Sequence, residues 1–156
     1  MIELVTLLKE LNYTVSTCES LTGGKFVSEM ISVSGASLVV KGGLVSYSNE
    51  TKINIAGIDK EMIVKFGVIS KEVARQMSVN ASRILNTDVA ISFTGNAGPS
   101  VMENKPCGLV FCCIVIREKI YDYELQLCGD RNSITTQVVD IMKQNCIRIL
   151  KELKSS

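Results

Sequence analysis

The chain has 156 residues and balanced charge, with 17 Lys and Arg against 16 Asp and Glu, so there is no general electrostatic case for nucleic-acid binding. Its length suits one domain spanning residues 1–156, and its few aromatic residues, with no Trp, argue against base stacking. It has no histidine, so a Ser-His-Asp triad is impossible and the commonest zinc ligand is missing.

The sequence shows no membrane span and no secretion signal. Its apolar runs fall far short of the roughly 18 residues that suggest a transmembrane helix. The N-terminus lacks the basic region and apolar run of a secretion signal. We therefore expect a cytoplasmic protein without a membrane or nucleic-acid partner.

The six cysteines include no CxxC pair. We expect reduced and mostly buried thiols rather than a disulfide framework or a metal site. Cys112 and Cys113 are adjacent, so on a strand their side chains would point to opposite faces. Cys18 is a poor candidate nucleophile, because no histidine is present to lower its pKa, although a helix N-terminus can help.

The first half of the chain alternates between helix and strand. Helically spaced apolar residues predict a helix over 2–11, and the β-rich residues 13–17 predict a strand after it. A second helix is expected over 24–34 and a second strand over 43–48. The short segment 49–56 is expected to be helical.

The second half contains the clearest helix, over 70–86, which begins at a serine suited to capping. The nearly all-apolar segment 88–94 predicts a central strand. Residues 108–116 and 119–127 predict a hairpin, and a long helix over 130–153 closes the chain. This order indicates a mixed sheet covered by helices on both faces.

Three chemically unusual loops, near residues 20, 47 and 95, each follow a predicted strand. In open α/β sheets the ligand crevice lies outside the carboxyl ends of the strands. We therefore expect these loops to meet in a single site.

Ser20 is the candidate nucleophile of that site. A serine hydroxyl needs a neighbouring base, and its alternative role here is to cap the helix that follows. Beyond it, the backbone N–H groups of Thr22, Gly23 and Gly24 could bind a phosphate or a developing oxyanion. A P-loop is excluded, because Glu19 stands where that motif needs glycine and no Ser or Thr follows the lysine.

Lys52 is the candidate base. If Asn49 caps the short helix, Lys52 occupies its third position, where the helix dipole favours the neutral amine that a base requires. The alternative is an exposed surface lysine. Tyr47 could pass a proton or orient the amine, or it could be an ordinary core tyrosine. Glu50 could pair with a cation or serve as a first-turn acid.

Two further turns could bind substrate. Backbone N–H groups could line a phosphate or carbonyl pocket in the turn formed by Thr94, Gly95, Asn96, Ala97 and Gly98. Alternatively, this segment is simply a turn. Asp130 is a natural N-cap, and Arg131 could reach a phosphate or carboxylate with two hydrogen bonds.

Taken together, these stretches resemble the C-terminal domain family of the competence- and damage-inducible protein CinA, which includes stand-alone nicotinamide mononucleotide amidohydrolases. The resemblance runs from about Leu8 to Leu153. Its motifs lie at residues 19–24 (ESLTGG), 42–52 (GGLVSYSNETK), 67–70 (GVIS), 94–99 (TGNAGP), 105–108 (KPCG) and 129–131 (GDR).

The resemblance implies a three-layer α/β/α sandwich with a mixed, mostly parallel sheet of about five strands. It also implies hydrolysis of the carboxamide of nicotinamide mononucleotide to nicotinic acid mononucleotide and ammonia, no metal or cofactor, and a homo-oligomer. The family's nucleophile, tyrosine and lysine fall on Ser20, Tyr47 and Lys52. Its anion-binding turns fall on residues 22–24 and 94–98.

The chain departs from the family at several positions. Cys18 and Leu21 stand where the family usually has Ala and Cys. Asn96 replaces an Ile, and Val101 and Met102 replace a glycine pair, which removes backbone freedom next to a turn expected to touch substrate. The alternative function is therefore a catalytically impaired module of the same fold that binds a nucleotide or a protein.

Overall fold

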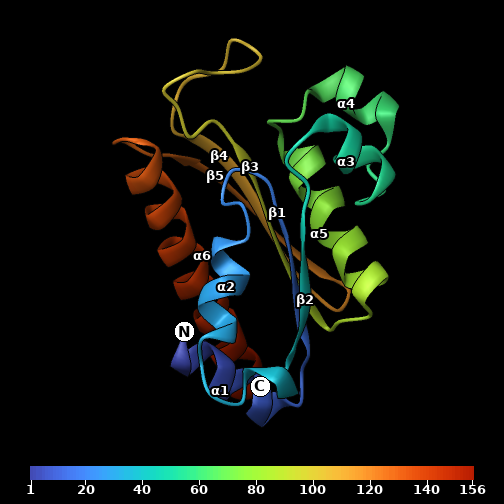
Figure 1. Cartoon of the computed structure of the whole chain (residues 1–156). Helices are drawn as coiled ribbons and strands as arrows, with labels where there is room; N and C mark the ends of the chain where they lie inside the picture. The colour runs from blue at the N-terminus through green and yellow to red at the C-terminus, as the bar shows by residue number, and fades with distance from the viewer.

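The structure, a computed structural model, describes all 156 residues. Its helices and strands follow one another in the order α1 (Ile2–Leu11), β1 (Val15–Glu19), α2 (Lys25–Ile31), the 3-10 helix η1 (Ala36–Leu38), β2 (Val40–Val45), α3 (Asn49–Asn54), α4 (Lys60–Phe66), α5 (Lys71–Leu85), β3 (Val89–Gly95), β4 (Leu109–Ile116), β5 (Lys119–Gln126) and α6 (Arg131–Lys154) (Figure 1).

The five strands form one mixed sheet in the order β2-β1-β3-β4-β5. β2, β1 and β3 are parallel neighbours, whereas β4 pairs antiparallel with both β3 and β5. Only β4 therefore runs against the other strands, which confirms the mixed, mostly parallel sheet expected above. The hairpin of β4 and β5 also turns at residues 117–118, as expected.

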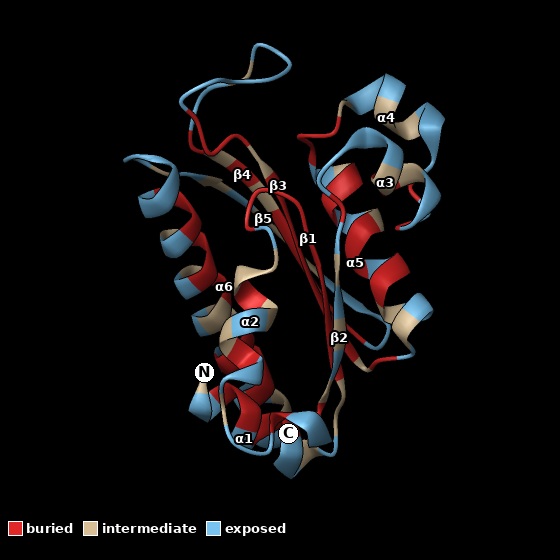
Figure 2. Cartoon of the chain, in the orientation of Figure 1, coloured by how far each residue is buried: buried red, intermediate tan, exposed pale blue.

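Helices cover both faces of the sheet (Figures 1 and 2). α1, α2 and α6 pack on one face and enclose the larger core, while α5 packs on the other face with the segments around α3 and α4. Strand residues alternate between these layers: Ile91 lies in the first core and Ala90 in the second. Cys112 and Cys113 face opposite sides of the sheet, as expected.

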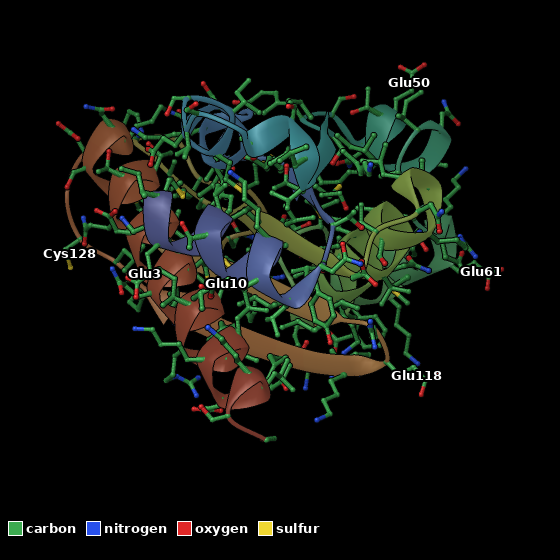
Figure 3. All side chains as sticks on the ribbon, turned by 90° about the horizontal axis from the view of Figure 1, so that it is seen from below. Glu3, Glu10, Glu50, Glu61, Glu118 and Cys128 are labelled. Atoms are coloured by element: carbon green, nitrogen blue, oxygen red, sulfur yellow. The ribbon has the colours of Figure 1, made fainter.

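α6 is amphipathic and packs along α1. Lys151 pairs with Glu3 at 2.6 Å and Lys154 with Glu10 at 2.8 Å, on the surface seen in Figure 3. Exposed pairs of this kind contribute little stability, so the apolar stripe of α6 carries the contact. None of the helices has both the length and the apolar character needed to cross a bilayer.

The observed elements differ from the expected ones mainly around the first two strands. β1 begins at Val15 rather than at residue 13 and ends with a fully buried glutamate, Glu19. β2 covers Val40–Val45 instead of 43–48. α4 was not expected, because it buries none of its residues and so has no clear apolar stripe.

Candidate active site

The carboxyl ends of β1, β2 and β3 meet at one edge of the sheet (Figure 1). The Ser20 N–H donates to the Phe93 carbonyl at 3.0 Å, and the Ser46 N–H donates to the Glu19 carbonyl at 2.9 Å. These backbone bonds continue the parallel pairing past the strand ends. As a result, the loops that follow the three strands are held side by side.

Ser20 and Lys52 lie within hydrogen-bonding distance, with 2.9 Å between Ser20 Oγ and Lys52 Nζ. The same Nζ donates to the carbonyl of Ser46 at 2.8 Å and to that of Tyr47 at 3.4 Å. Lys52 is only 1% exposed, which excludes the alternative of a surface lysine. Burial lowers the pKa of its amine below the ordinary lysine value, although Cys18 and Glu103 act weakly in the opposite direction.

The helix that carries Lys52 begins one residue earlier than expected. Ser48, not Asn49, is the N-cap of α3 and forms a capping box with Thr51, whose backbone N–H donates to Ser48 Oγ at 3.1 Å. Lys52 is therefore the fourth residue of α3. Its side chain reaches Ser20 from the first turn of the helix.

Ser20 does not cap α2, so that alternative was wrong. Gly24 occupies the N-cap position with φ of 94°, and the capping carboxylate is that of Glu19. Glu19 accepts hydrogen bonds from the backbone N–H groups of Gly24 at 3.1 Å, Phe26 at 3.1 Å and Val27 at 2.9 Å. It also accepts from the hydroxyls of Thr17 and Thr22, at 3.0 and 2.6 Å.

This role of Glu19 was not predicted from the sequence. The available signal was a carboxylate at the end of a strand, just before a Gly-Gly turn. Five hydrogen bonds to one buried side chain fix the turn that carries Ser20. Glu19 is thus a structural residue of the site.

The free backbone donors near Ser20 differ from those expected. The N–H of Gly23 donates to the Ser20 carbonyl at 3.0 Å, and that of Gly24 donates to Glu19. The N–H groups of these two turns that have no acceptor in the chain include those of Leu21, Thr22, Ala97 and Gly98. The anion-binding potential of the first turn is therefore limited to its first half.

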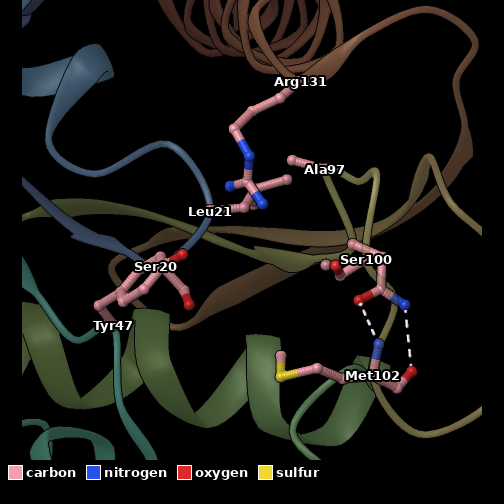
Figure 4. A pocket seen from close by; sticks show the side chains of 9 residues that line it. Ser20, Leu21, Tyr47, Ala97, Ser100, Met102 and Arg131 are labelled. Carbon is pink, nitrogen blue, oxygen red and sulfur yellow. Dashed lines mark hydrogen bonds between the residues drawn. The ribbon is translucent and has the colours of Figure 1, made fainter.

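Ser20 opens into a cavity of about 230 Å³ (Figure 4). The cavity is lined by Ser20, Leu21, Tyr47, Gly95, Asn96, Ala97, Ser100, Met102 and Arg131. Tyr47 is 64% exposed and forms part of the wall, so it is not a core tyrosine. Its hydroxyl makes no hydrogen bond within the chain. Tyr47 instead contacts Lys52 through its backbone carbonyl, which accepts a hydrogen bond from the Lys52 amine.

A second cavity, of about 550 Å³, adjoins the first and shares Leu21 and Arg131 with it. Thr22 and the cation Lys25 also line it. Arg131 opens α6, whose N-cap is Asp130, as expected. The guanidinium of Arg131 thus lies where both cavities can reach it.

The residues of the turn after β3, at positions 94–98, have mainly a structural role. The Thr94 hydroxyl donates to the Val68 carbonyl at 2.8 Å, and Thr94 lines neither cavity. Gly95 must lack a side chain, because a Cβ there would lie 2.5 Å from the Leu109 carbonyl oxygen. Asn96 is buried and binds the backbone of the following loop. Gly98 also lies outside the two cavity linings.

Other candidate groups lie away from this chemistry. Burial raises the pKa of the Cys18 thiol to about 11, so it is protonated at neutral pH and a weak nucleophile. All six cysteines are free, and Cys107 and Cys128 are exposed. Glu50 forms no ion pair and extends outward from the first turn of α3 (Figure 3).

Comparison with known proteins shows the family of the chain. The family described as CinA C-terminal domain matches residues 1–150. The protein MG115 homolog of Mycoplasma pneumoniae is 35% identical over 141 residues, which cover 90% of each chain. A CinA-like protein of Kosmotoga olearia is 41% identical over 131 residues, which cover 83% of this chain but only 32% of that protein.

Solved structures show the same fold. A CinA superfamily protein from Klebsiella pneumoniae matches with a TM-score of 0.94 at 23% identity, covering 97% of this chain and 95% of the other. The competence/damage inducible protein CihA from Agrobacterium tumefaciens matches with a TM-score of 0.87 at 30% identity, covering 97% and 91%. The chain therefore belongs to the CinA C-terminal domain family.

Proposed function

We propose that this protein hydrolyses the carboxamide of nicotinamide mononucleotide to nicotinic acid mononucleotide and ammonia, a reaction of pyridine nucleotide salvage. The proposal combines the resemblance of the motifs with one structural observation. The observation is the 2.9 Å approach of Ser20 Oγ to the buried amine of Lys52.

The environment of the amine suits a base. A neutral lysine has two N–H donors and one lone pair, and two backbone carbonyls, those of Ser46 and Tyr47, already accept from Nζ. The remaining direction faces the Ser20 hydroxyl. In the neutral form the lone pair can therefore accept the Ser20 proton, which activates the oxygen.

The reaction then proceeds in two halves. Ser20 Oγ attacks the carboxamide carbon while its proton moves to Lys52 Nζ. The tetrahedral intermediate collapses as Lys52 returns that proton to the leaving nitrogen, and ammonia departs from an acyl ester on Ser20. Water attacks the ester, Lys52 takes a proton from the water, and the acid is released as the Ser20 hydroxyl is restored.

Stabilisation of the oxyanion falls to the free backbone N–H groups. Those of Leu21 and Thr22 follow the nucleophile directly, and that of Ala97, which lines the same cavity as Ser20, comes from the facing turn. Donors fixed before the reaction stabilise developing charge without reorganisation. No histidine or charged side chain is needed for this role.

The second cavity suits the ribose phosphate. The first cavity, about 230 Å³, fits a ring amide better than a whole nucleotide. The adjoining cavity offers two cations, Lys25 and Arg131, against one carboxylate, that of Asp130, which caps α6. Arg131, which borders both cavities, can bind the phosphate while the carboxamide lies at Ser20.

An ammonia assay on the purified protein tests the proposal, with nicotinamide mononucleotide offered beside nicotinamide and glutamine. The expected result is ammonia release from the nucleotide and its loss in Ser20→Ala. Release by Ser20→Ala at the parental rate would rule the mechanism out. Ligand-induced thermal stabilisation without turnover would instead favour the alternative, a binding module of the same fold.

The remaining expectations stay predictions. They are a single domain over residues 1–156, a cytoplasmic location, a homo-oligomeric state and independence from metal ions. Light scattering of the purified chain checks the homo-oligomeric state. The ammonia assay repeated with a chelator checks the independence from metal ions.

A further inference from the structure

The loop between β3 and β4 contributes one wall of the Ser20 cavity, and two separate attachments fix it. The first is Asn96, which is only 3% exposed. Its side-chain amide donates to the carbonyls of Met102 at 3.1 Å and Lys105 at 3.0 Å. Its oxygen accepts from the Met102 N–H at 3.0 Å (Figure 4). Met102 is thus bonded to Asn96 through both of its backbone polar groups.

The second attachment lies just beyond Met102. The Glu103 carboxylate accepts from the N–H groups of Val68 at 2.6 Å and Ile69 at 3.2 Å. Lys105 donates to Glu103 at 3.0 Å. Gly67 leaves room for this carboxylate, because a Cβ there would lie 2.5 Å from Glu103 Oε2. The loop is therefore tied to the segment before α5, with Met102 between the two attachments.

Met102 presents an apolar side chain to the cavity. It is 52% exposed, and it lines the cavity together with Leu21, Ala97 and Tyr47. In Figure 4 it lies on the opposite side of the cavity from Arg131. A half-exposed methionine held in place at a cavity wall is suited to contact a flat apolar ring, since the thioether packs well against aromatic groups.

We propose that Met102 is a specificity-determining residue that contacts the ring carrying the carboxamide, and that Asn96 is the positioning residue that holds it there. The inference rests on the proposed function, since it names the part of that substrate which Met102 recognises. It also accounts for two departures of this chain from its family. Asn96 and Met102 act as a pair, one fixing the backbone and the other contacting the ligand.

The test uses Met102→Ala with two competitive ligands, nicotinic acid mononucleotide, which has the ring, and ribose 5-phosphate, which lacks it. We expect the KM for nicotinamide mononucleotide and the inhibition constant of nicotinic acid mononucleotide to rise about 3- to 10-fold, while kcat changes little. The inhibition constant of ribose 5-phosphate should stay constant. Met102→Leu, which conserves volume, should restore most of the affinity.

Val101→Ala is the matched control, because Val101 lies in the same loop, is 46% exposed and does not line the cavity. It should leave all three constants unchanged. Asn96→Ala should raise the same KM. The double variant with Met102→Ala should show no further rise, because both changes remove one contact. Thermal unfolding of each variant separates this effect from loss of folding.

Three outcomes would overturn the inference: an unchanged KM in Met102→Ala, an equal rise for both competitive ligands, or additive effects in the double variant. If the parental protein releases no ammonia, the proposed function fails by itself. Thermal stabilisation by the two ligands then still tests Met102. In that measurement, only stabilisation by nicotinic acid mononucleotide should depend on the methionine.

Discussion

Ser20 and Lys52 come from segments that follow neighbouring parallel strands, and they meet at 2.9 Å without a carboxylate beside them. Lys52 takes part in none of the ion pairs of the chain. A buried lysine next to a carboxylate would keep its proton. Here only neutral oxygens form hydrogen bonds with the amine, and desolvation lowers its pKa more than the charges of Cys18 and Glu103 raise it. This arrangement is what allows Lys52 to act as a base.

Lys52→Met removes the base but keeps an unbranched side chain of similar length. We expect ammonia release from nicotinamide mononucleotide to fall by about 10²- to 10⁴-fold, the usual contribution of a general base. Lys52→Arg should be similarly impaired, since a guanidinium keeps its proton at any working pH. Steady-state kinetics give both values, and circular dichroism checks the fold. Activity in either variant within threefold of the parent would contradict the assignment.

The pH dependence of kcat/KM should follow the fraction of Lys52 that is in its neutral form. Only the neutral form of Lys52 accepts the serine proton, so kcat/KM should rise with pH until the amine is deprotonated. Because burial lowers the Lys52 pKa, this rise should level off below the pH at which an ordinary lysine titrates. A rate profile from pH 5 to 10 measures it. A rate that falls over the same range would exclude an amine base.

The same shift predicts how stability depends on pH. The pKa of Lys52 is lower in the folded protein than the value of about 10.4 expected when the chain is unfolded, so between the two values the unfolded chain binds more protons. The free energy of unfolding should therefore rise with pH in that window. The cost of burying the charged amine is present in full below the folded pKa.

Other groups titrate in this range, so Lys52→Met is the reference. The parental protein should gain stability relative to the variant as pH increases toward about 10.4. Urea denaturation at several pH values measures the difference. A constant difference would show that the Lys52 pKa is not lowered by folding.

Glu19→Gln tests the turn that carries the nucleophile. Glutamine has the same size, but its NH₂ group would face backbone N–H donors, so hydrogen bonds are lost in a fully buried place. We expect the free energy of unfolding to fall by about 3 kcal/mol. Glu50→Gln, an exposed site, should change it by less than about 0.5 kcal/mol. An equal change in the free energy of unfolding in the two variants would contradict a structural role for Glu19.

Cys18→Ala separates serine from cysteine chemistry. The thiol is buried and protonated at neutral pH, because burial raises its pKa to about 11. We expect the variant to release ammonia within a few-fold of the parental rate, while Ser20→Ala does not. Loss of activity in a folded Cys18→Ala protein would point to the thiol instead. Thermal unfolding provides the control for folding.

Much of the fold could be predicted because several elements carry their own local signals. α5 has an apolar stripe and a serine N-cap, and β3 is a buried and mostly apolar segment. The boundaries of β1 were harder, because its last residue is a buried glutamate, and a carboxylate ordinarily marks the end of a strand. The groups that donate to its carboxylate lie only two to eight residues away along the chain, but the sequence does not show that the turn after β1 folds back onto it.

The candidate site could also be predicted only in part from the sequence. Ser20 and Lys52 stood out by residue type and by the strands that precede them. The burial of Lys52 depends on packing by Ser46 and Tyr47, which local sequence does not report. The role of Asn96 was also hidden, because its partners lie in a loop whose path is set by long-range contacts.

The most direct measurement of the central claim is the mass of the peptide that contains Ser20, taken from protein quenched during turnover of nicotinamide mononucleotide. We predict that this peptide gains the mass of the nicotinic acid mononucleotide acyl group in the parental protein. The adduct should be absent or greatly reduced in Lys52→Met. Turnover with the acyl group on a different residue, or an undiminished adduct in the lysine variant, would contradict activation of Ser20 by Lys52.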